Sequence, residues 1–458
     1  MIPLSELNWN LIEILYLIII FIVSFFATYF ILPYIIEFMK KKKYIGYDIH
    51  KNARPEIAES GGLSIVIGFV IASILVMIFF SNFFKITFIF LLTVLLAGLI
   101  GFIDDRIKFK SRYKIILSLF SGSAIFLAIY LDFINIPSPI IPFLDRTRLT
   151  IIYPLVLPII VAVFINTVNM LEGYNGEGSG TCLIAVCFLF ICGLLWNSAE
   201  AVIFSIPVIA VIIPFFVYNK FPSKVFPGDI GTLSMGAMIA GIALFGSLEV
   251  AAFCALLIHI FNSFYVIYSV RGFLESSDIR EKKEDIILLA DDRIKASDQK
   301  DAALTLPRLI LAKGALTEPE LVKNFYVISI ICGFFSIVSI FFMQWTLGNY
   351  NIFSIFLIIV ILGVPTSFLL YKFPRTRGII TLMIILLVSG IIFLIIVEFL
   401  IIPLPIGIIN LGVIKIPINL LFVFLLFIVG FIVWYYITIR YFWQQINKMK
   451  TKKLNEFD

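Results

Sequence analysis

Long apolar stretches alternate with short polar stretches along almost the whole chain. Thirteen of them are long and apolar enough to be membrane-spanning helices, at approximately 11–38, 62–80, 86–103, 115–131, 151–169, 181–195, 201–218, 232–246, 249–270, 325–344, 352–371, 378–400 and 418–439. The pair 232–246 and 249–270 is the hardest to delimit, because the first is short and the turn between them is tight. Residues 401–417, with prolines and an alternating pattern, are expected to form an external loop. The pattern predicts an all-α, polytopic membrane protein.

Composition agrees with this fold class. Of the 458 residues, 61% are hydrophobic and only 14% are charged. In soluble domains roughly a quarter of the residues are charged. The first apolar run is far longer than the core of a signal peptide and lacks a small-residue cleavage site, so we expect no cleavable signal. The cysteines match no zinc or redox spacing and are expected to be inert buried thiols; they are Cys182, Cys187, Cys192, Cys254 and Cys332.

The distribution of Lys and Arg predicts the orientation. Loops that follow odd-numbered spans hold 31 of the 35 basic residues, and the opposite side holds Lys85, Arg146, Arg148 and Lys415. Because basic loops stay in the cytoplasm, the N-terminus is expected outside and the C-terminus inside. The net charge of +6 is therefore a topology signal, and no nucleic-acid partner is expected.

All the polar and glycine-rich motifs follow odd-numbered spans, so they are expected to meet at the cytoplasmic face. A transporter usually places its ionisable residues near the middle of the membrane. Here the interiors of the spans hold almost no charge, which favours a reaction at the membrane surface.

The first motif is the pair Asp104-Asp105, at the end of the third span. Two carboxylates at a helix C-terminus are unfavourable, because the helix dipole there favours cations. Nearby cations, a divalent metal or a phosphate-bearing ligand would offset the repulsion; the cations are Arg106, Lys108, Lys110, Arg112 and Lys114. A solvated charged loop is the alternative interpretation.

The second motif is FINTVNMLEGYNGEGSG, at residues 164–180. Asn166 and Asn169 are three residues apart and share one helix face, where amide oxygens can bind a hard metal. The four glycines let the backbone approach a ligand and expose its N–H groups to phosphate. The alternative is a glycine-rich turn capped by asparagine.

Two further loops carry polar residues. In YNKFPSKVFPGDIG, Asp229 precedes a helix of small residues, where it is either a ligand or only an N-cap, and Phe226 is either an interfacial anchor or a stacking surface for a base. The first cytoplasmic loop contains Asp48, Lys51 and Glu59. The mixed-charge loop 271–324 reads most simply as a helix lying on the membrane surface.

In combination, GFIDD…K, INTVNMLEGYNG and VFPGD resemble the polyprenyl-phosphate N-acetylhexosamine-1-phosphate transferases. The stretches YDIHK, AESGG, YNKFPSKVFPGD, IFNSFY and PRLILAKGAL are most similar to the eukaryotic and archaeal branch, the UDP-GlcNAc–dolichyl-phosphate GlcNAc-1-phosphotransferases. The resemblance covers approximately residues 40–320. It implies transfer of a sugar 1-phosphate from a UDP-sugar to a dolichyl-type phosphate, with release of UMP, as the first step of a lipid-linked glycan (N-glycosylation) pathway.

The resemblance also implies roles for individual residues. Asn169 and Asp229 match magnesium ligands, with manganese as an alternative ion, and Lys114 matches a diphosphate-binding lysine. Asp104 and Asp105 match an acidic pair near the metal and the acceptor phosphate, and with Lys114 and Asp229 they form the expected catalytic set. The expected substrate-binding residues are Asn175 and Phe226 for the uracil, Asn166 as support, Asp48, Lys51 and Glu59 of the first loop, and Arg308.

The chain departs from that family in two ways. Where the dolichol branch has an Arg-His-Arg cluster, this chain has Ala303, Leu304 and Thr305, which leaves Arg308. Two alternatives follow: Arg271, Arg280 or Arg293 substitutes for the cluster, or the sugar is not N-acetylglucosamine. The family core usually has ten spans, so we expect a transferase core at 1–350, including loop 271–324, and additional spans at 351–458 without an inferred function.

Three questions stay open from the sequence. A transferase acting on undecaprenyl phosphate for cell-envelope glycans and a non-enzymatic nucleotide-sugar or lipid transporter are the alternative functions. The expected location is a multi-pass plasma membrane protein in a prokaryote or archaeon, or an endoplasmic reticulum protein in a eukaryote, with the site facing the cytoplasm. The oligomeric state is undetermined, with a homodimer as one option.

Overall fold

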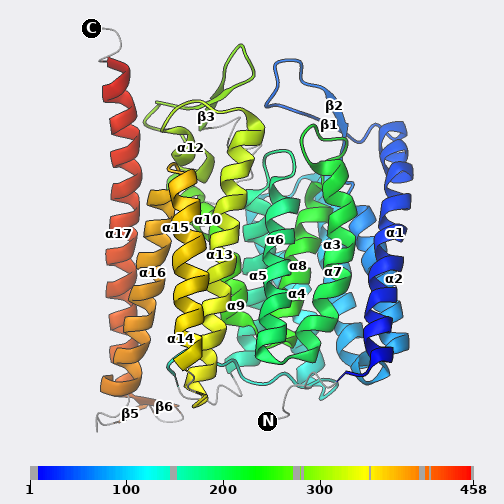
Figure 1. The fold of residues 1–458 in the computed structure, drawn as a ribbon, viewed down its shortest axis with the longest axis vertical. Coiled ribbons are helices and arrows are strands. Elements are labelled where there is room, and N and C mark those ends of the chain that lie inside the picture. Colours follow the sequence, from blue (N-terminus) through cyan, green and yellow to red (C-terminus); the bar gives the residue numbers. More distant parts are fainter. Residues whose placement is uncertain are drawn as a thin grey trace. The chain divides into compact units, whose positions relative to one another are not determined.

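The computed structural model describes residues 9–144, 152–271, 279, 283–349, 352–401, 408–411 and 414–454. The chain is almost entirely helical (Figure 1) and divides into two compact units, one of Met1–Pro139 with Leu149–Ile337 and one of Ile140–Arg148 with Val338–Asp458. Among the described residues, ten helices are long and apolar enough to cross a membrane, and a bent pair adds an eleventh. The predicted all-α, multi-pass membrane fold is confirmed.

The first unit holds most of the helices. They are α1 (Leu11–Lys41), α2 (Leu63–Phe79), α3 (Phe84–Ile107), α4 (Ser111–Tyr130), α5 (Ile152–Leu171), α6 (Glu177–Trp196), α7 (Ala199–Asn219), α8 (Gly228–Phe245), α9 (Glu249–Ala255), α10 (Leu257–Val270), α12 (Leu306–Leu311) and the larger part of α13 (Glu318–Thr346). The predicted span 249–270 is broken, because α9 and α10 meet at an angle of 66°. The other predicted spans of this unit coincide with single helices.

The second unit contains the remaining helices, namely α14 (Ile352–Ile358), α15 (Val364–Lys372), α16 (Arg377–Ile396) and α17 (Ile418–Leu454). A π-helical segment, Ile359–Gly363, joins α14 to α15, and another, Val397–Ile401, extends α16. Helices α16 and α17 pack against each other. Residues 408–417, which the sequence excluded as a span, contain the antiparallel strands β5 (Ile408–Leu411) and β6 (Ile414–Pro417).

The prediction of a surface helix in loop 271–324 is wrong for the described part of that loop. It forms a hairpin of β3 (Ile286–Leu288) and β4 (Ile294–Ala296), followed by the short helix α12 and the first turns of α13. Branched aliphatic residues favour strands. The intervening Asp292 has φ +58, a conformation that aspartate tolerates and that suits a tight turn.

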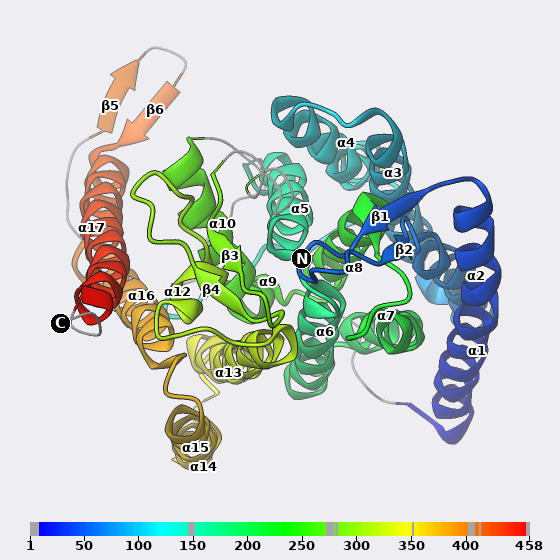
Figure 2. The same ribbon diagram turned by 90° about the horizontal axis from the view of Figure 1, so that it is seen from above.

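Helix α8 lies at the centre of the first unit (Figure 2), where it packs against α2, α3, α5, α6, α7 and α9. Its sequence, GDIGTLSMGAMIAGIALF, is rich in small residues. Small side chains let helix backbones approach closely in a membrane, where van der Waals packing drives association. A Cβ atom on Gly101 of α3 would lie 2.4 Å from the carbonyl oxygen of Asp229. The start of α8 is therefore held directly against the end of α3.

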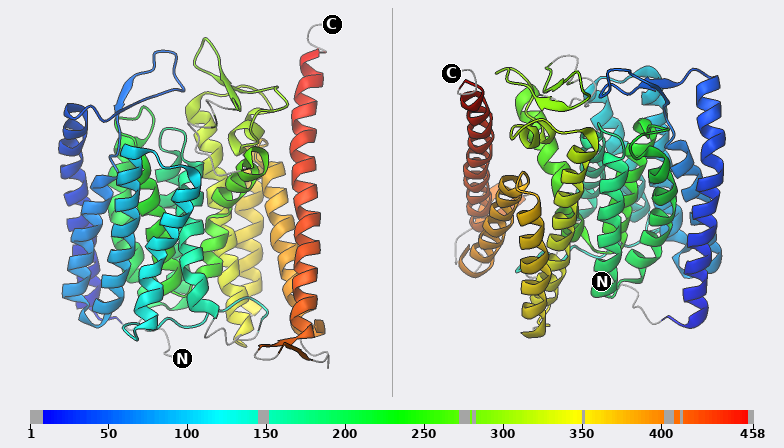
Figure 3. Two further views of the ribbon diagram at one scale, coloured as in Figure 1. Left: turned by 180° about the vertical axis from the view of Figure 1, so that it is seen from behind. Right: turned by 45° about the horizontal axis from the view of Figure 1, so that its top comes forward.

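At the end of the first unit where α3 ends and α8 begins, backbone hydrogen bonds join the loops. Strand β1 (Ile45–Tyr47) pairs with β2 (Glu56–Ala58), and the hairpin lies at the same end of the first unit as β3 and β4 (Figure 3). The N–H of Phe226 donates to the carbonyl of Ala58 at 2.8 Å, and that of Gly61 to the carbonyl of Phe226 at 2.9 Å. The first loop thus fixes the segment that leads into α8.

Candidate functional site

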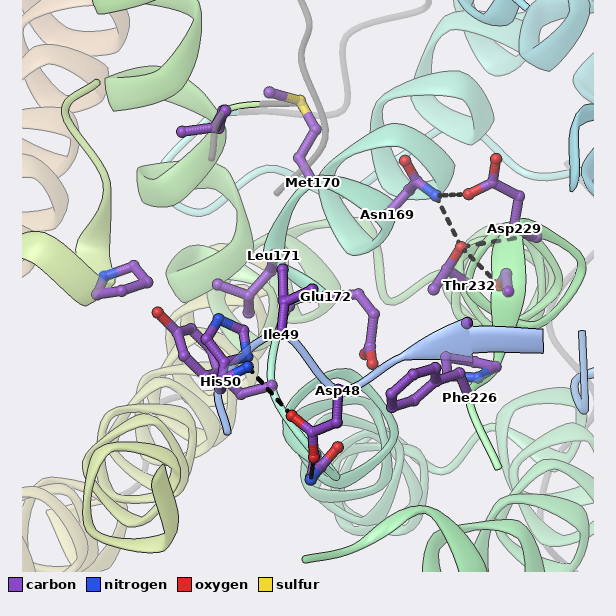
Figure 4. A pocket seen from close by; sticks show the side chains of 18 of the residues that line it. Asp48, Ile49, His50, Asn169, Met170, Leu171, Glu172, Phe226, Asp229 and Thr232 are labelled. Carbon is purple, nitrogen blue, oxygen red and sulfur yellow. Dashed lines mark hydrogen bonds between the residues drawn. The ribbon is translucent and has the colours of Figure 1, made fainter. Parts of the chain in front are cut away.

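A cavity of about 460 Å³ opens at this end of the first unit, among β1, the turn between α5 and α6, the start of α8 and loop 271–324 (Figure 4). Such a volume suits a small ligand such as a nucleotide sugar. Half of the predicted site residues line it, namely Asp48, Glu59, Asn169, Asn175, Phe226 and Asp229. The other six are absent from its lining, namely Lys51, Asp104, Asp105, Lys114, Asn166 and Arg308.

Four predicted residues, each from a different helix, meet in what we call the acidic cluster: Asp104 of α3, Lys114 of α4, Asn169 of α5 and Asp229 of α8. Lys114 Nζ lies 2.6 Å from Asp104 Oδ2 and 3.0 Å from Asp229 Oδ2. Asn169 Nδ2 donates to Asp229 Oδ1 at 2.7 Å and to Thr232 Oγ1 at 2.8 Å (Figure 4). The side chains of Asn169 and Asp229 are thus close enough to bind one cation together.

The side-chain oxygen atoms of the acidic cluster are suitable ligands for a hard divalent ion. Asp229 supplies two carboxylate oxygens, and rotating the Asn169 amide by half a turn would put Oδ1 in the place of Nδ2, so that an oxygen faces an ion beside Asp229. Mg²⁺ prefers oxygen ligands and usually binds few protein groups, taking the rest from phosphates and water. Lys114 neutralises the excess carboxylate charge when no ion is bound.

Asp105 makes contacts different from those of Asp104, although the sequence predicted a common role for the pair. Its Oδ1 accepts the backbone N–H of Asp229 at 2.7 Å, and its Oδ2 accepts the hydroxyl of Ser60 at 2.6 Å. The first N–H groups of a helix have no partner within the helix. Asp105 therefore caps α8 and ties it to the first loop, while Asp104 contacts Lys114.

A second group of polar residues, which we call the amide cluster, surrounds Asn175. Asp48 Oδ2 accepts from Lys51 Nζ at 2.5 Å and from Asn175 Nδ2 at 3.0 Å. Burial opposes ionisation of Asp48, but the hydrogen bonds from Lys51 and Asn175 outweigh it and lower the pKa of this carboxyl group. Glu318 Oε1 accepts the backbone N–H of Asn175 at 2.8 Å.

The amide cluster contains two residues to which the sequence assigned no role, His50 and Glu318. The His50 ring stacks on Tyr174 with centroids 4.2 Å apart. One ligand atom each of Asp48, His50 and Glu318 lies within 4.8 Å of the others. The ammonium group of Lys51 already provides the positive charge there, so the geometry does not favour a metal ion.

Two other predicted residues lie at the edges of the site. Burial raises the pKa of Glu59, which lines the cavity. Asn166 lies deeper, where its Nδ2 donates to Ser118 Oγ and to the carbonyl of Ala162, both at 2.7 Å. Asn166 therefore links α5 to α4 and supports the site without lining the cavity.

Glu172 also lines the cavity, and sequence reasoning noted it only as part of the glycine-rich motif. Burial raises the pKa of Glu172 to about 8. A carboxyl group whose pKa is raised by folding stabilises the fold fully below its unfolded pKa, near 4.5, and this contribution is lost as the pH rises toward 8.

We therefore expect the free energy of unfolding of Glu172→Gln to depend less on pH than that of the wild type. The free energy of unfolding of the wild type should fall by up to about 1.4 kcal/mol per pH unit because of this group between pH 5 and pH 8. Thermal unfolding in detergent across this range measures the slope, which should be shallower in the variant. Parallel curves for both proteins would contradict the assignment.

Arg308 does not bind in the cavity as predicted, because its guanidinium group is used within loop 271–324. The side chain is 0% exposed, and it donates to the carbonyl oxygens of Ser297, Gln299, Ala302 and Ala303. Of the substitutes considered for the missing cluster, Arg271 is exposed, Arg293 pairs with Asp291, and Arg280 lies outside the described residues. Arg308 therefore holds the loop together.

We expect Arg308→Met to lower the free energy of unfolding by about 3 kcal/mol or more, because buried carbonyl groups would lose their donors. The KM for substrate should stay unchanged in the folded fraction. Arg293→Met is the matched control, since its exposed ion pair contributes at most about 1 kcal/mol. A normal melting temperature combined with a raised KM would restore the predicted substrate contact.

Comparisons with known proteins show the family to which the chain belongs. Residues 87–247 match the family described as glycosyl transferase family 4. A protein of Methanocaldococcus jannaschii, provisionally named a glycosyltransferase, is 30% identical over 70% of this chain and 94% of its own. A Sulfolobus acidocaldarius protein, provisionally named a UDP-N-acetylglucosamine–dolichyl-phosphate N-acetylglucosaminephosphotransferase, is 32% identical over 53% of this chain and 75% of its own. The phospho-N-acetylmuramoyl-pentapeptide-transferase of Streptococcus mutans is 28% identical over 49% and 70%.

Proposed function

Because the chain belongs to glycosyl transferase family 4 and is a membrane-embedded polyprenyl-phosphate sugar-1-phosphate transferase, we propose that it transfers N-acetylglucosamine 1-phosphate from UDP-N-acetylglucosamine to dolichyl phosphate. An oxygen of the acceptor phosphate attacks the β-phosphorus of the donor. The bond from that phosphorus to the bridging oxygen breaks, and UMP leaves.

The observation that carries this proposal is the meeting of Asp104, Lys114, Asn169 and Asp229, of which Asn169 and Asp229 line the cavity. These residues lie far apart in the sequence, and each comes from a different helix. They combine oxygen ligands for a cation with a lysine for phosphate. This combination suits a diphosphate substrate, and we propose direct attack by the acceptor phosphate.

The family depends on a divalent metal, and we propose Mg²⁺, held by Asn169 and Asp229. When bound, the ion neutralises the donor diphosphate and stabilises the charge on the leaving UMP. Lys114, released from its carboxylate partners, contacts phosphate oxygens and stabilises negative charge in the transition state. A phosphate acceptor is largely ionised at neutral pH, since its second pKa is near ~6. Asp104 therefore positions groups and does not need to remove a proton.

We assign the part of the cavity around Asn175 and Phe226 to the uracil base. Phe226 supplies an aromatic face for stacking, and Asn175 an amide for hydrogen bonds. The backbone contacts of Phe226 with the first loop hold its ring at the cavity. Asp48, Lys51 and Glu59 belong to this binding region in the proposal, Asp48 and Lys51 by supporting Asn175.

The acceptor lipid would approach along α3 and α4. Next to the acidic cluster these helices expose large apolar side chains, including Leu99, Ile116 and Phe120, each more than half exposed. A prenyl chain can lie against such a surface within the bilayer, while its phosphate stays at headgroup level beside Lys114. We propose that this end faces the cytoplasm, which the excess of Lys and Arg in its loops supports under the positive-inside rule.

The direct test incubates membranes containing the protein with labelled UDP-N-acetylglucosamine, Mg²⁺ and dolichyl phosphate. A lipid-linked sugar diphosphate and UMP should form in equal amounts. Preference for undecaprenyl phosphate in a parallel reaction would assign the protein to cell-envelope glycans. Nucleotide sugar accumulating intact in sealed vesicles, without UMP, would show transport and reject the proposal.

A further inference from the structure

The side-chain amide of Asn175 is held in one orientation by two carboxylates. Its Nδ2 donates to Asp48 Oδ2 at 3.0 Å and to Glu318 Oε2 at 3.4 Å, while the backbone N–H of Asn175 donates to Glu318 Oε1. Turning the amide over would bring Oδ1 against these two carboxylate oxygens. Since an asparagine oxygen accepts and cannot donate, that orientation would lose both hydrogen bonds and add repulsion.

This arrangement leaves only the oxygen of the amide for a ligand. Asn175 lines the cavity, and its Nδ2 donates to two carboxylates, those of Asp48, which also lines the cavity, and of Glu318, which does not. Its Oδ1 accepts no hydrogen bond within the described part of the chain. The cavity therefore presents an acceptor at this position, with the aromatic side chain of Phe226 also in its lining.

We propose that Glu318 is a positioning residue that makes the cavity select uracil over cytosine. This inference rests on the proposed function and goes further, because it assigns the choice of base to a residue outside the cavity. Uracil carries a donor, N3–H, between its two carbonyl groups, and cytosine carries a bare acceptor nitrogen there. A fixed Oδ1 accepts from uracil N3–H and repels the cytosine lone pair, and a site built for a donor rejects a ligand that lacks it.

Glu318 acts from the first turn of α13, and it does not line the cavity. It is 3% exposed and lies 143 residues from Asn175 in the sequence. Its neighbour Glu320 provides a matched control, because it lies in the same helical turn but accepts from the N–H and hydroxyl of Thr317 instead. Replacing either carboxylate by an amide changes the local charge equally.

The experiment compares wild type, Glu318→Gln and Glu320→Gln in the transfer reaction, with UDP and CDP as competing inhibitors. Glutamine at 318 can keep one oxygen on the backbone N–H but turns an NH₂ group toward the Asn175 amide. We expect the KM for the UDP-sugar to rise about tenfold, kcat to stay within about threefold, and the preference for UDP over CDP to fall about tenfold. Glu320→Gln should behave like the wild type.

A second probe, N3-methyl-UDP, tests the orientation in the wild type and needs no variant. The methyl group replaces the N3 hydrogen, so this compound should inhibit at least about tenfold more weakly than UDP. Equal inhibition by the two compounds overturns the proposal, as does a folded Glu318→Gln protein with the wild-type preference for UDP. If the wild type transfers no sugar phosphate from any UDP-sugar, the proposed function itself is wrong. The two outcomes above, by contrast, reject only the role of Glu318.

Discussion

Replacing Asp229 by asparagine should lower kcat by about 10²–10³-fold, which corresponds to roughly 3 kcal/mol of transition-state stabilisation. The substitution keeps the shape of the side chain and removes its charge. Its carboxylate contacts both Lys114 and Asn169, so its loss weakens the proposed metal site and releases the lysine together. The rate of UMP release from labelled UDP-sugar measures the effect.

Two measurements make this result specific. Asp291→Asn is the matched control, because Asp291 is an exposed carboxylate on the β3–β4 hairpin whose ion pair among the described residues is with Arg293. It should leave kcat unchanged. Mn²⁺ binding to the purified proteins, followed by electron paramagnetic resonance without substrate, should weaken in Asp229→Asn alone. A variant that binds Mn²⁺ and turns over normally would remove Asp229 from the site.

Lys114→Met should lower kcat by a similar factor, about 10²–10³, for a different reason. Methionine keeps the apolar stem of lysine and removes the ammonium group that lies between Asp104 and Asp229. The transition state then loses a fixed positive charge near the transferred phosphoryl group. The acidic cluster also loses its own counter-charge, so its carboxylates repel each other more strongly.

This second effect separates Lys114 from Asp229. Without the lysine the cluster is more negative, so Lys114→Met should bind Mn²⁺ more tightly than the wild type although its kcat is reduced. In Asp229→Asn, by contrast, both the Mn²⁺ affinity and kcat should decrease. Lys110→Met, four residues earlier at an exposed position, is the control and should change neither. Unchanged Mn²⁺ affinity in Lys114→Met would show that the lysine does not balance the metal site.

The helices and the grouping of the motifs could be predicted from the sequence, because hydrophobic length and the positions of Lys and Arg are determined by the bilayer itself. The exact ends of the helices depend on contacts with other segments of the chain. Helix α3 continues past the apolar run to Ile107, since Asp104 and Asp105 find partners in Lys114, Ser60 and α8. A hydropathy pattern contains no information about such partners.

Other features depend on contacts between distant segments and have no local signal. The sequence assigned no role to Glu318, which lies within loop 271–324, and only the folded chain brings it to Asn175. Arg308 was read as a substrate ligand because it stood near a missing basic cluster. Its actual partners are carbonyl groups of its own loop, which no motif encodes.

The hydrogen bonds of Asn175 have a consequence for biosynthesis. Its amide depends on Asp48, 127 residues earlier, and on Glu318, 143 residues later. Membrane helices enter the bilayer in order from the N-terminus, so a nascent chain lacks part of the proposed base-binding pocket until the start of α13 has been synthesised. Newly made protein should therefore acquire its full nucleotide affinity late, and chains that end before Glu318 should bind UDP more weakly even when all earlier spans are inserted.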